Sequence, residues 1–498
     1  MNVNPITRLD YPDPDVIRVE DTYYMVSTTM HFMPGCEILQ SFDLVHWEHV
    51  TYVYETLDHT DAQQLKSGQN IYGQGMWAAS LRYHEGRFYI CFVANDTRKT
   101  YLYTSEKIDG PWKKQLIEGF YHDGSLLFDE DGRNYIVYGN DEIWITELNE
   151  DLTAPKKDGL HRLLVSDHKN PKLGYEGSHI QKINGYYYIF LVHSLRDRWM
   201  RTEACFYSDS LEGEFTGGDV LCDDRGYCGQ GVAQGGIVDT PDGKWYAMLF
   251  QDSGAVGRLP ILLPVTWKDH FPFFGQNGHV PEEIEVHSTR PGYIYQPLVG
   301  SDDFCNGLLP RWQFNHDPDP RYYHLDALQG TYTITTREVC TELTQAVNTL
   351  TQRMSYPSCA AEVTVDASAL KEGDVAGLCA LQSCYAAVGI TKHHGKYEVL
   401  MLDKKEDGIL DMTEGTVVES HQMDFRLEAD FCNMKDEARC YYRVNKGDWL
   451  PIGTVHKLYF KLDHFTGCRF GLFCYAAEET GGSACFRDFK YYDVDEIS

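Results

Sequence analysis

Basic residues are scarce in this sequence. Its 498 residues include 44 Lys and Arg against 74 Asp and Glu, which gives a formal net charge of -30. Proteins hold nucleic acids and anionic membranes mainly through Lys and Arg. The charge balance therefore argues against nucleic acid and membrane partners, and it favours a neutral substrate over an anionic one.

Long hydrophobic runs are missing as well. No run of about 18 apolar residues occurs, so we expect no transmembrane helix. The opening residues, "MNVNPITRLDYPDP", lack the basic and apolar segments of a signal peptide. None of the 15 cysteines shows paired C-x-x-C spacing, so we expect reduced, mostly buried thiols in a cytoplasmic protein.

What the sequence does contain is a repeated β-hairpin. With 34 Tyr and 23 Phe, the composition favours β-structure. Each repeat has a short apolar strand, an acidic or Gly-containing turn and a second strand that opens with aromatic residues. The repeats are "DPDVIRVEDTYY", "WAASLRYHEGRFY", "DGSLLFDEDGRNY", "EGSHIQKINGYYY" and "QGGIVDTPDGKWY".

The spacing of these hairpins predicts a β-propeller. Blades of four strands recur every 40 to 50 residues or so, and loop insertions lengthen that period. Five repeats therefore predict an all-β, five-bladed β-propeller over residues 1–300. Aligned on their last tyrosine, the repeats begin at residues that should face the central axis, namely Asp13, Trp77, Asp123, Glu176 and Gln234.

Three carboxylates at one axis predict chemistry rather than structure, because clustered carboxylates repel one another. Glycoside hydrolysis needs two carboxyl groups across the scissile bond, and a third can keep the acid protonated. The face of Trp77 and the many tyrosines suit the apolar face of a sugar ring. On chemistry alone, a carboxylate-lined metal site stays open.

The motifs also carry a family resemblance. The segments "YPDPDVIRVEDTYYMVST", "FMPGCEILQSFDLVHWE", "GQGMWAASLRY", "DGSLLFDEDGRNYIVYGND", "YEGSHIQKINGYYYIFLV" and "GRLPILLPVTW" follow one another in order. Over residues 4 to 270 the chain resembles the family 43 glycoside hydrolases, which are inverting five-bladed propellers that act on arabinose- and xylose-containing polysaccharides.

The resemblance implies a role for each axial residue. Asp13 would be the general base that activates water, and Glu176 would be the general acid. Asp123 would tune the pKa of the acid and orient it. Arg258, in "VGRLP", would contact the substrate, and Trp77 and Phe32 would line the sugar subsite.

Gln234 departs from the family pattern. Many members carry a histidine at this axial position, sometimes as a ligand of an axial calcium. A glutamine here makes such a calcium doubtful, so no metal ligand is assigned and no cofactor is required. A structural calcium elsewhere stays open without an identified ligand set.

The hairpin repeat stops near residue 300. Residues 301–498 contain short alternating strands such as "GTYTITT", "CAAEVTVDA" and "RFGLFCYA", which predict an antiparallel β-sandwich. This part resembles the lectin-like, concanavalin-like domain of one branch of the family. In that branch the sandwich can bring a loop to the active-site mouth, which favours removal of single terminal sugars.

We therefore predict an inverting exo-glycosidase that releases terminal β-D-xylose, α-L-arabinofuranose or both from short oligosaccharides. Two alternatives stay open: an endo-acting arabinanase and a non-catalytic carbohydrate-binding propeller. The sequence leaves the preferred pentose, the linkage and a homo-oligomeric state undecided.

Overall fold

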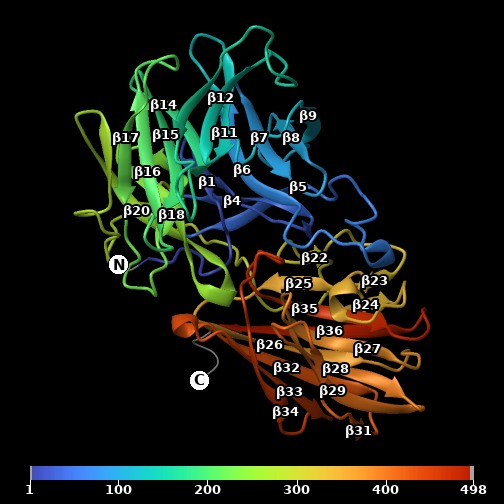
Figure 1. Cartoon of the computed structure of the whole chain (residues 1–498). Helices are drawn as coiled ribbons and strands as arrows, with labels where there is room; N and C mark the ends of the chain where they lie inside the picture. Colours follow the sequence, from blue (N-terminus) through green and yellow to red (C-terminus); the bar gives the residue numbers. More distant parts are fainter. Residues whose placement is uncertain (1–2, 494–498) are drawn as a thin grey trace.

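The N-terminal half is a ring of five four-stranded antiparallel sheets, as the computed structural model shows (Figure 1). The structure describes residues 3–493. The first blade contains β1 (Asp15–Val19), β2 (Thr22–Val26), β4 (Gly35–Ser41) and β5 (Glu48–Tyr54). The second contains β6 (Met76–His84), β7 (Arg87–Ala94), β8 (Lys99–Ser105) and β9 (Lys113–Ile117).

The other three blades repeat this arrangement. The third contains β10 (Ser125–Phe128), β11 (Asn134–Asn140), β12 (Glu142–Leu148) and β13 (His161–Ser166). The fourth contains β14 (Glu176–Ile183), β15 (Tyr186–Ser194), β16 (Arg201–Ser208) and β17 (Thr216–Leu221). The fifth contains β18 (Val232–Asp239), β19 (Trp245–Asp252), β20 (Arg258–Lys268) and β21 (Phe271–Phe274).

Local turn chemistry builds each blade. In the fourth blade Asn184 and Gly185 both adopt positive φ, 51° and 84°, as a two-residue Asn-Gly hairpin turn requires. Apolar clusters then fill the spaces between neighbouring blades. The N-terminal segment closes the ring, because the Ile6 and Tyr11 amides donate to carbonyls of β20.

The C-terminal half is a sandwich of two antiparallel sheets. The seven-stranded sheet contains β23 (Tyr323–Asp326), β24 (Thr331–Thr335), β36 (Ser483–Asp493), β26 (Ser358–Asp366), β32 (Gln422–Asp430), β33 (Glu437–Val444) and β34 (Leu450–Lys457). The nine-stranded sheet contains β3 (Phe32–Met33), β22 (Gln313–Asn315), β25 (Leu350–Arg353), β35 (Arg469–Ala476), β27 (Asp374–Leu381), β28 (Ala386–His393), β29 (Lys396–Lys404), β30 (Leu410–Met412) and β31 (Thr416–Val418).

The larger sheet includes a strand from the propeller. Strand β3 belongs to the first blade's loop, and it pairs antiparallel with β22, with Phe314 opposite Met33. A buried ion pair lies nearby, where Arg353 of β25 contacts Glu37 of β4 at 2.8 Å. Removing one partner of such a pair typically costs about 3–5 kcal/mol of unfolding free energy. The two halves are therefore tightly joined.

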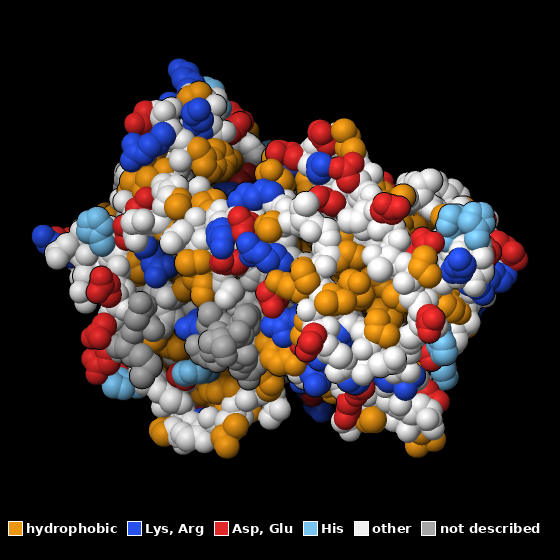
Figure 2. Space-filling model, turned by 90° about the horizontal axis from the view of Figure 1, so that it is seen from below, with side chains coloured by type: hydrophobic (Ala, Val, Ile, Leu, Met, Phe, Trp, Pro, Cys, Tyr) orange, Lys and Arg blue, Asp and Glu red, His pale blue; other side chains and the backbone are white. Residues whose placement is uncertain are grey.

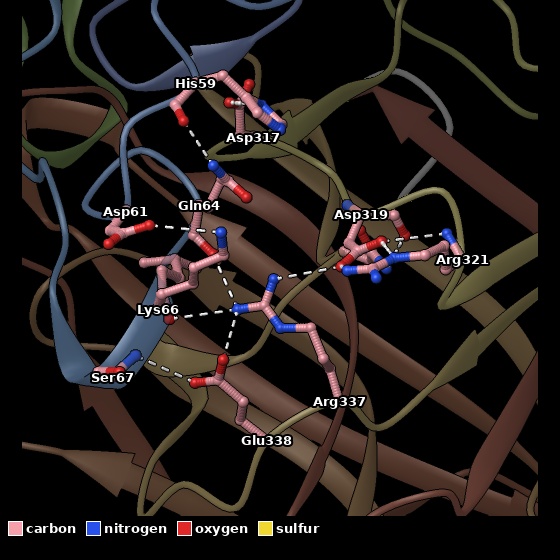
Figure 3. Close-up of polar contacts among 12 residues, drawn as sticks. His59, Asp61, Gln64, Lys66, Ser67, Asp317, Asp319, Arg321, Arg337 and Glu338 are labelled. Atoms are coloured by element: carbon pink, nitrogen blue, oxygen red, sulfur yellow. Dashed lines mark hydrogen bonds and ion pairs between the residues drawn. The ribbon is translucent and has the colours of Figure 1, made fainter.

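A polar cluster extends this junction (Figure 3). Propeller residues 59–67 lie against the sandwich, where His59 Nδ1 contacts Asp317 at 2.7 Å and Arg337 donates to the Gln64 carbonyl at 2.9 Å. The Ser67 amide donates to Glu338 at 3.2 Å. These contacts position the segment that leads into the second blade.

The fold predictions are confirmed: the protein is an all-β, five-bladed propeller followed by a concanavalin-like sandwich. The boundary at residue 300 stays a prediction.

Within the described part of the chain, the helices are four short 3-10 turns, η1 (Lys66–Gly68), η2 (Gly254–Val256), η3 (Leu343–Gln345) and η4 (Cys432–Met434). Among residues 3–493, no helix could cross a membrane. Acidic and basic side chains are interspersed on the face shown in Figure 2.

Candidate active site

The active-site face follows from the blade topology. The first strands of the blades contact one another around the axis. In each antiparallel blade, the start of the first strand and the loop between the second and third strands lie at the same end. Residues from these strand starts and loops therefore converge above the axis.

The backbone at the axis is left-handed. Asp13, Asp123, Gly177 and Gln234 have φ values of 53°, 47°, 66° and 65°. Non-glycine residues adopt this conformation at an energetic cost, and such residues cluster at functional sites. Gly177, rather than Glu176, matches the other three in conformation, so the predicted alignment is one residue off in the fourth blade. A Cβ at Gly177 would approach Gln234 Cγ at 2.8 Å.

Asp13 is a buried carboxylate with fixed partners. The Thr28 hydroxyl donates to Asp13 Oδ2 at 2.6 Å, and Arg258 Nη1 contacts Asp13 Oδ1 at 3.2 Å. The Arg258 guanidinium lies 5.4 Å from the Phe250 ring centroid and 4.4 Å from that of Phe465. Asp13 is thus ionically paired and rigidly oriented, as a base requires.

Two further carboxyl groups of the site belong to Glu176 and Asp123. Asn140 Nδ2 donates to Glu176 Oε2 at 2.8 Å, and the Gly177 amide donates to Asp123 Oδ2 at 3.0 Å. Burial, together with the negative charges of Glu176 and Asp13, raises the pKa of Asp123 to about 6, although His122 acts in the opposite direction. A carboxyl group that titrates this close to neutral pH suits acid–base chemistry.

His122 lies between these two carboxyl groups. Its Nε2 is 3.5 Å from both Asp123 Oδ2 and Glu176 Oε2. Burial alone would lower the pKa of His122, but the carboxylates of Asp123, Glu176 and Asp13 outweigh it and raise the pKa to about 9. His122 therefore carries a positive charge at neutral pH beside the predicted general acid.

Aromatic side chains form the wall of the site. Trp77 is half-buried, with its ring centroid 5.8 Å from that of His122 and 5.6 Å from that of Phe465. Phe465 comes from the sandwich loop of residues 458–468, and its carbonyl accepts a hydrogen bond from Arg258 Nη2 at 3.4 Å. The second domain thus completes the wall of the first domain's site.

The structure brings together six of the seven predicted site residues. Asp13, Asp123 and Glu176 lie with Trp77, Arg258 and Gln234 around one axis, and their individual roles stay predictions.

Phe32 is the exception, and its predicted contact with a sugar is corrected. Its side chain is completely buried in the domain junction, with its ring centroid 3.4 Å from the Arg469 guanidinium carbon. Strand β3 pairs with the sandwich sheet and carries Phe32 into the shared core, so the ring has no exposed surface to offer a ligand.

Several site residues were missed in the sequence. Thr28, Asn140 and Arg201 come from loops or strand ends between the second and third strands of blades one, three and four, and hairpin topology alone could have suggested them. His122 directly precedes Asp123, and this adjacency in the sequence could have identified it as a site residue. Phe465 had no local signal, because it reaches the site from the other domain.

Three of these residues also have the arrangement of metal ligands. Donor atoms of His122, Asp123 and Glu176 all lie within 4.8 Å of one another, the one such group in the part of the chain that the structure describes. Because both carboxyl groups have a place in acid–base hydrolysis, we assign no metal to them.

Comparison with known proteins decides the family. The model of "Glycosyl hydrolases family 43" matches residues 3–272, and that of "Beta xylosidase C-terminal Concanavalin A-like domain" matches residues 301–492. The chain belongs to glycosyl hydrolase family 43. It is therefore a glycoside hydrolase, in agreement with the prediction from its motifs.

Individual relatives extend over both domains of this family 43 enzyme. A β-xylosidase of Formosa agariphila is 26% identical and aligns with 99% of this chain and 89% of its own. A non-reducing end α-L-arabinofuranosidase of Bacteroides ovatus is 24% identical over 82% of this chain and 79% of its own.

A solved structure shares the whole architecture. The structure of a bifunctional GH43-CE protein of Bacteroides eggerthii is 42% identical to this chain, with a TM-score of 0.92. It covers 98% of this family 43 chain, which spans only 63% of that protein's length.

Proposed function

We propose that this enzyme is an inverting exo-glycosidase that releases terminal β-D-xylose, α-L-arabinofuranose or both from oligosaccharides. The observation that carries the proposal is the pair of differently held carboxyl groups. Asp13 is ionically paired with Arg258, whereas Glu176 lies beside Asp123 and His122. The names of the relatives, β-xylosidase and α-L-arabinofuranosidase, supply the two candidate sugars.

The proposed reaction is a single displacement. Glu176 gives its proton to the glycosidic oxygen as the bond to the leaving sugar breaks. Asp13 takes a proton from the water that attacks the anomeric carbon from the opposite face. Asp123, held by a hydrogen bond from the Gly177 amide, orients the acid. These steps need no cofactor.

The wall formed by the sandwich loop supports exo-action. Phe465 packs against Trp77 and Arg258 at the site, which favours a pocket for one terminal sugar over an open groove. An endo-acting arabinanase would need such a groove.

The test uses 4-nitrophenyl β-D-xylopyranoside and 4-nitrophenyl α-L-arabinofuranoside side by side. We expect the wild type to release nitrophenol, with the ratio of rates naming the preferred pentose. Asp13→Asn should lower kcat by about 10³-fold or more, because an asparagine amide cannot take the proton from the attacking water.

Glu176→Gln should lower turnover of oligosaccharides similarly, and both variants should keep the wild-type melting temperature to within a few degrees. Near-normal rates in both variants would contradict the assignment. Binding of the sugars without turnover by the wild type would favour the carbohydrate-binding alternative instead.

A further inference from the structure

Trp199 is an exposed aromatic residue at the active-site face. The chain has nine tryptophans, and among residues 3–493 Trp199 is the most exposed of them, with 46% of its area accessible to solvent. Leaving a large aromatic ring in water forgoes the free energy that its burial would supply. A ligand that covers the ring would recover that free energy.

The loop that carries Trp199 is held in place. Residues 195–200 join β15 to β16, and the Leu195 amide donates to the Met200 carbonyl at 3.1 Å across the loop. Arg196 forms an ion pair with the buried carboxylate of Asp167, which anchors the same loop. The indole is thus presented on a fixed support.

Arg201 connects Trp199 to the catalytic carboxylates. Its guanidinium carbon lies 5.4 Å from the Trp199 ring centroid and 5.2 Å from that of Phe250. Phe250 in turn packs against Arg258, the partner of Asp13.

The Arg201 side chain is itself fixed but incompletely bonded. Its Nε donates to Asp252 at 2.9 Å, whereas neither of its Nη atoms donates a hydrogen bond within residues 3–493. The negative charges of Glu176 and Asp13 act on this guanidinium, which places it within their field. A planar fork of unused donors is well suited to a pair of hydroxyl groups.

The position of these residues in the fourth blade indicates which sugar unit of the bound substrate they contact. Glu176 begins β14 of the same blade, and a general acid must stand beside the oxygen of the leaving group. The sugar beyond that oxygen therefore extends over the fourth blade, where the loop of residues 195–200 lies.

We propose that Trp199 and Arg201 form the subsite for the leaving sugar, with the indole against the apolar face of a neutral pentose unit and the Arg201 Nη atoms donating to its hydroxyls. This assignment rests on the proposed glycosidase function. It makes Trp199 a specificity-determining residue that selects oligosaccharides over glycosides with small leaving groups.

The experiment compares two leaving groups in wild type and Trp199→Ala. One substrate is the trisaccharide of the preferred pentose, and the other is the corresponding glycosyl fluoride, whose leaving fluoride is too small to reach Trp199. We expect Trp199→Ala to lower kcat/KM for the trisaccharide by about tenfold or more, because the stacking surface is gone. For the fluoride, kcat/KM should stay within about twofold of wild type.

Trp449→Ala is the matched control, because Trp449 of the sandwich also has an arginine over its ring, Arg443 at 4.2 Å. Trp449→Ala should leave kcat/KM for both substrates at the wild-type value. Trp199→Phe should keep part of the trisaccharide kcat/KM that Trp199→Ala loses. Equal losses on both substrates, or no loss on either, would overturn the proposal.

If the wild type hydrolyses neither substrate, the proposed function is refuted. Calorimetric titration of wild type and Trp199→Ala with the trisaccharide then tests whether Trp199 contributes to sugar binding. Weaker binding by Trp199→Ala than by wild type would support it. Equal affinity, or no binding by the wild type, would overturn it.

Discussion

The imidazole of His122 lies between the carboxyl groups of Asp123 and Glu176. The pKa of His122 is raised to about 9, above its value near 6.5 in an unfolded chain. The charged imidazole therefore stabilises the folded state fully below about pH 6.5, and this contribution disappears as the pH rises through 9. At the scale of residues, this makes the charge on His122 a measurable part of stability.

We expect His122→Phe to lower the melting temperature more at pH 6 than at pH 10. Phenylalanine keeps a ring beside Trp77 but cannot carry the charge. Thermal unfolding of both proteins at the two pH values measures the effect. His161→Phe is the control, because the ring of His161 also contacts an indole, that of Trp144 at 5.2 Å, yet His161 lies exposed. An equal deficit for His122→Phe at both pH values would contradict the expectation.

At the scale of elements, the loop of residues 458–468 joins the sandwich to catalysis. Phe465 contacts Trp77 and Arg258 across the domain junction, and its backbone is left-handed with φ of 58°. We expect Phe465→Ala to lower kcat/KM for nitrophenyl pentosides by about tenfold, mainly through KM, because the sugar loses part of its apolar wall.

Steady-state kinetics of the variant check this expectation. Leu462→Ala is a control on the same loop, where Leu462 is 76% exposed. It should behave as wild type. If Phe465→Ala kept the wild-type KM and kcat, the loop would not form part of the sugar pocket.

At the scale of the whole molecule, three buried histidines occupy the domain junction. His31, His316 and His464 pack with Tyr72, with ring centroids between 4.5 and 5.1 Å apart. Burial, together with the nearby Arg469, lowers the pKa of His464 to about 3, and burial also lowers the pKa of His31 and His316. All three are neutral in the folded protein.

This junction should weaken in acid. Because the folded-state pKa values lie below the unfolded value near 6.5, the contribution to stability is present above pH 6.5 and is lost as the pH falls toward 3. For His464 alone, the loss between neutral pH and pH 5 is about 2 kcal/mol of unfolding free energy.

We expect the melting temperature of the wild type to fall more steeply from pH 7 to pH 5 than that of His464→Phe. Phenylalanine preserves the stack on Tyr72 and removes the titrating group, whose Nε2 has no hydrogen-bond partner within residues 3–493. Parallel pH dependences in the two proteins would show that this histidine does not destabilise the junction in acid.

The blades could be predicted because their signals are local. A turn such as Asn184–Gly185 and the strands beside it lie within a dozen residues, so the sequence displays each hairpin directly. Asp13 and Asp123 became visible for the same reason, since each begins a repeat. Glu176 was found as well, although its backbone lies one residue out of step with theirs.

Contacts between distant segments could not be predicted in the same way. Phe465 and Arg258 are 207 residues apart, and nothing around either residue indicates the other. Phe32 was misplaced for this reason too. Its apolar neighbours are compatible with a pocket wall or a core, and the choice was made by its pairing with β22 in the other domain.

The pairing of β3 with β22 bears on whether the propeller and the sandwich of such enzymes can be exchanged separately between relatives. A propeller produced without its sandwich would leave β3 without its pairing partner and would expose the buried side chains of Phe32 and Met33, which invites aggregation. It would also lose Phe465. Exchanging catalytic halves among relatives must therefore transfer the sandwich with them.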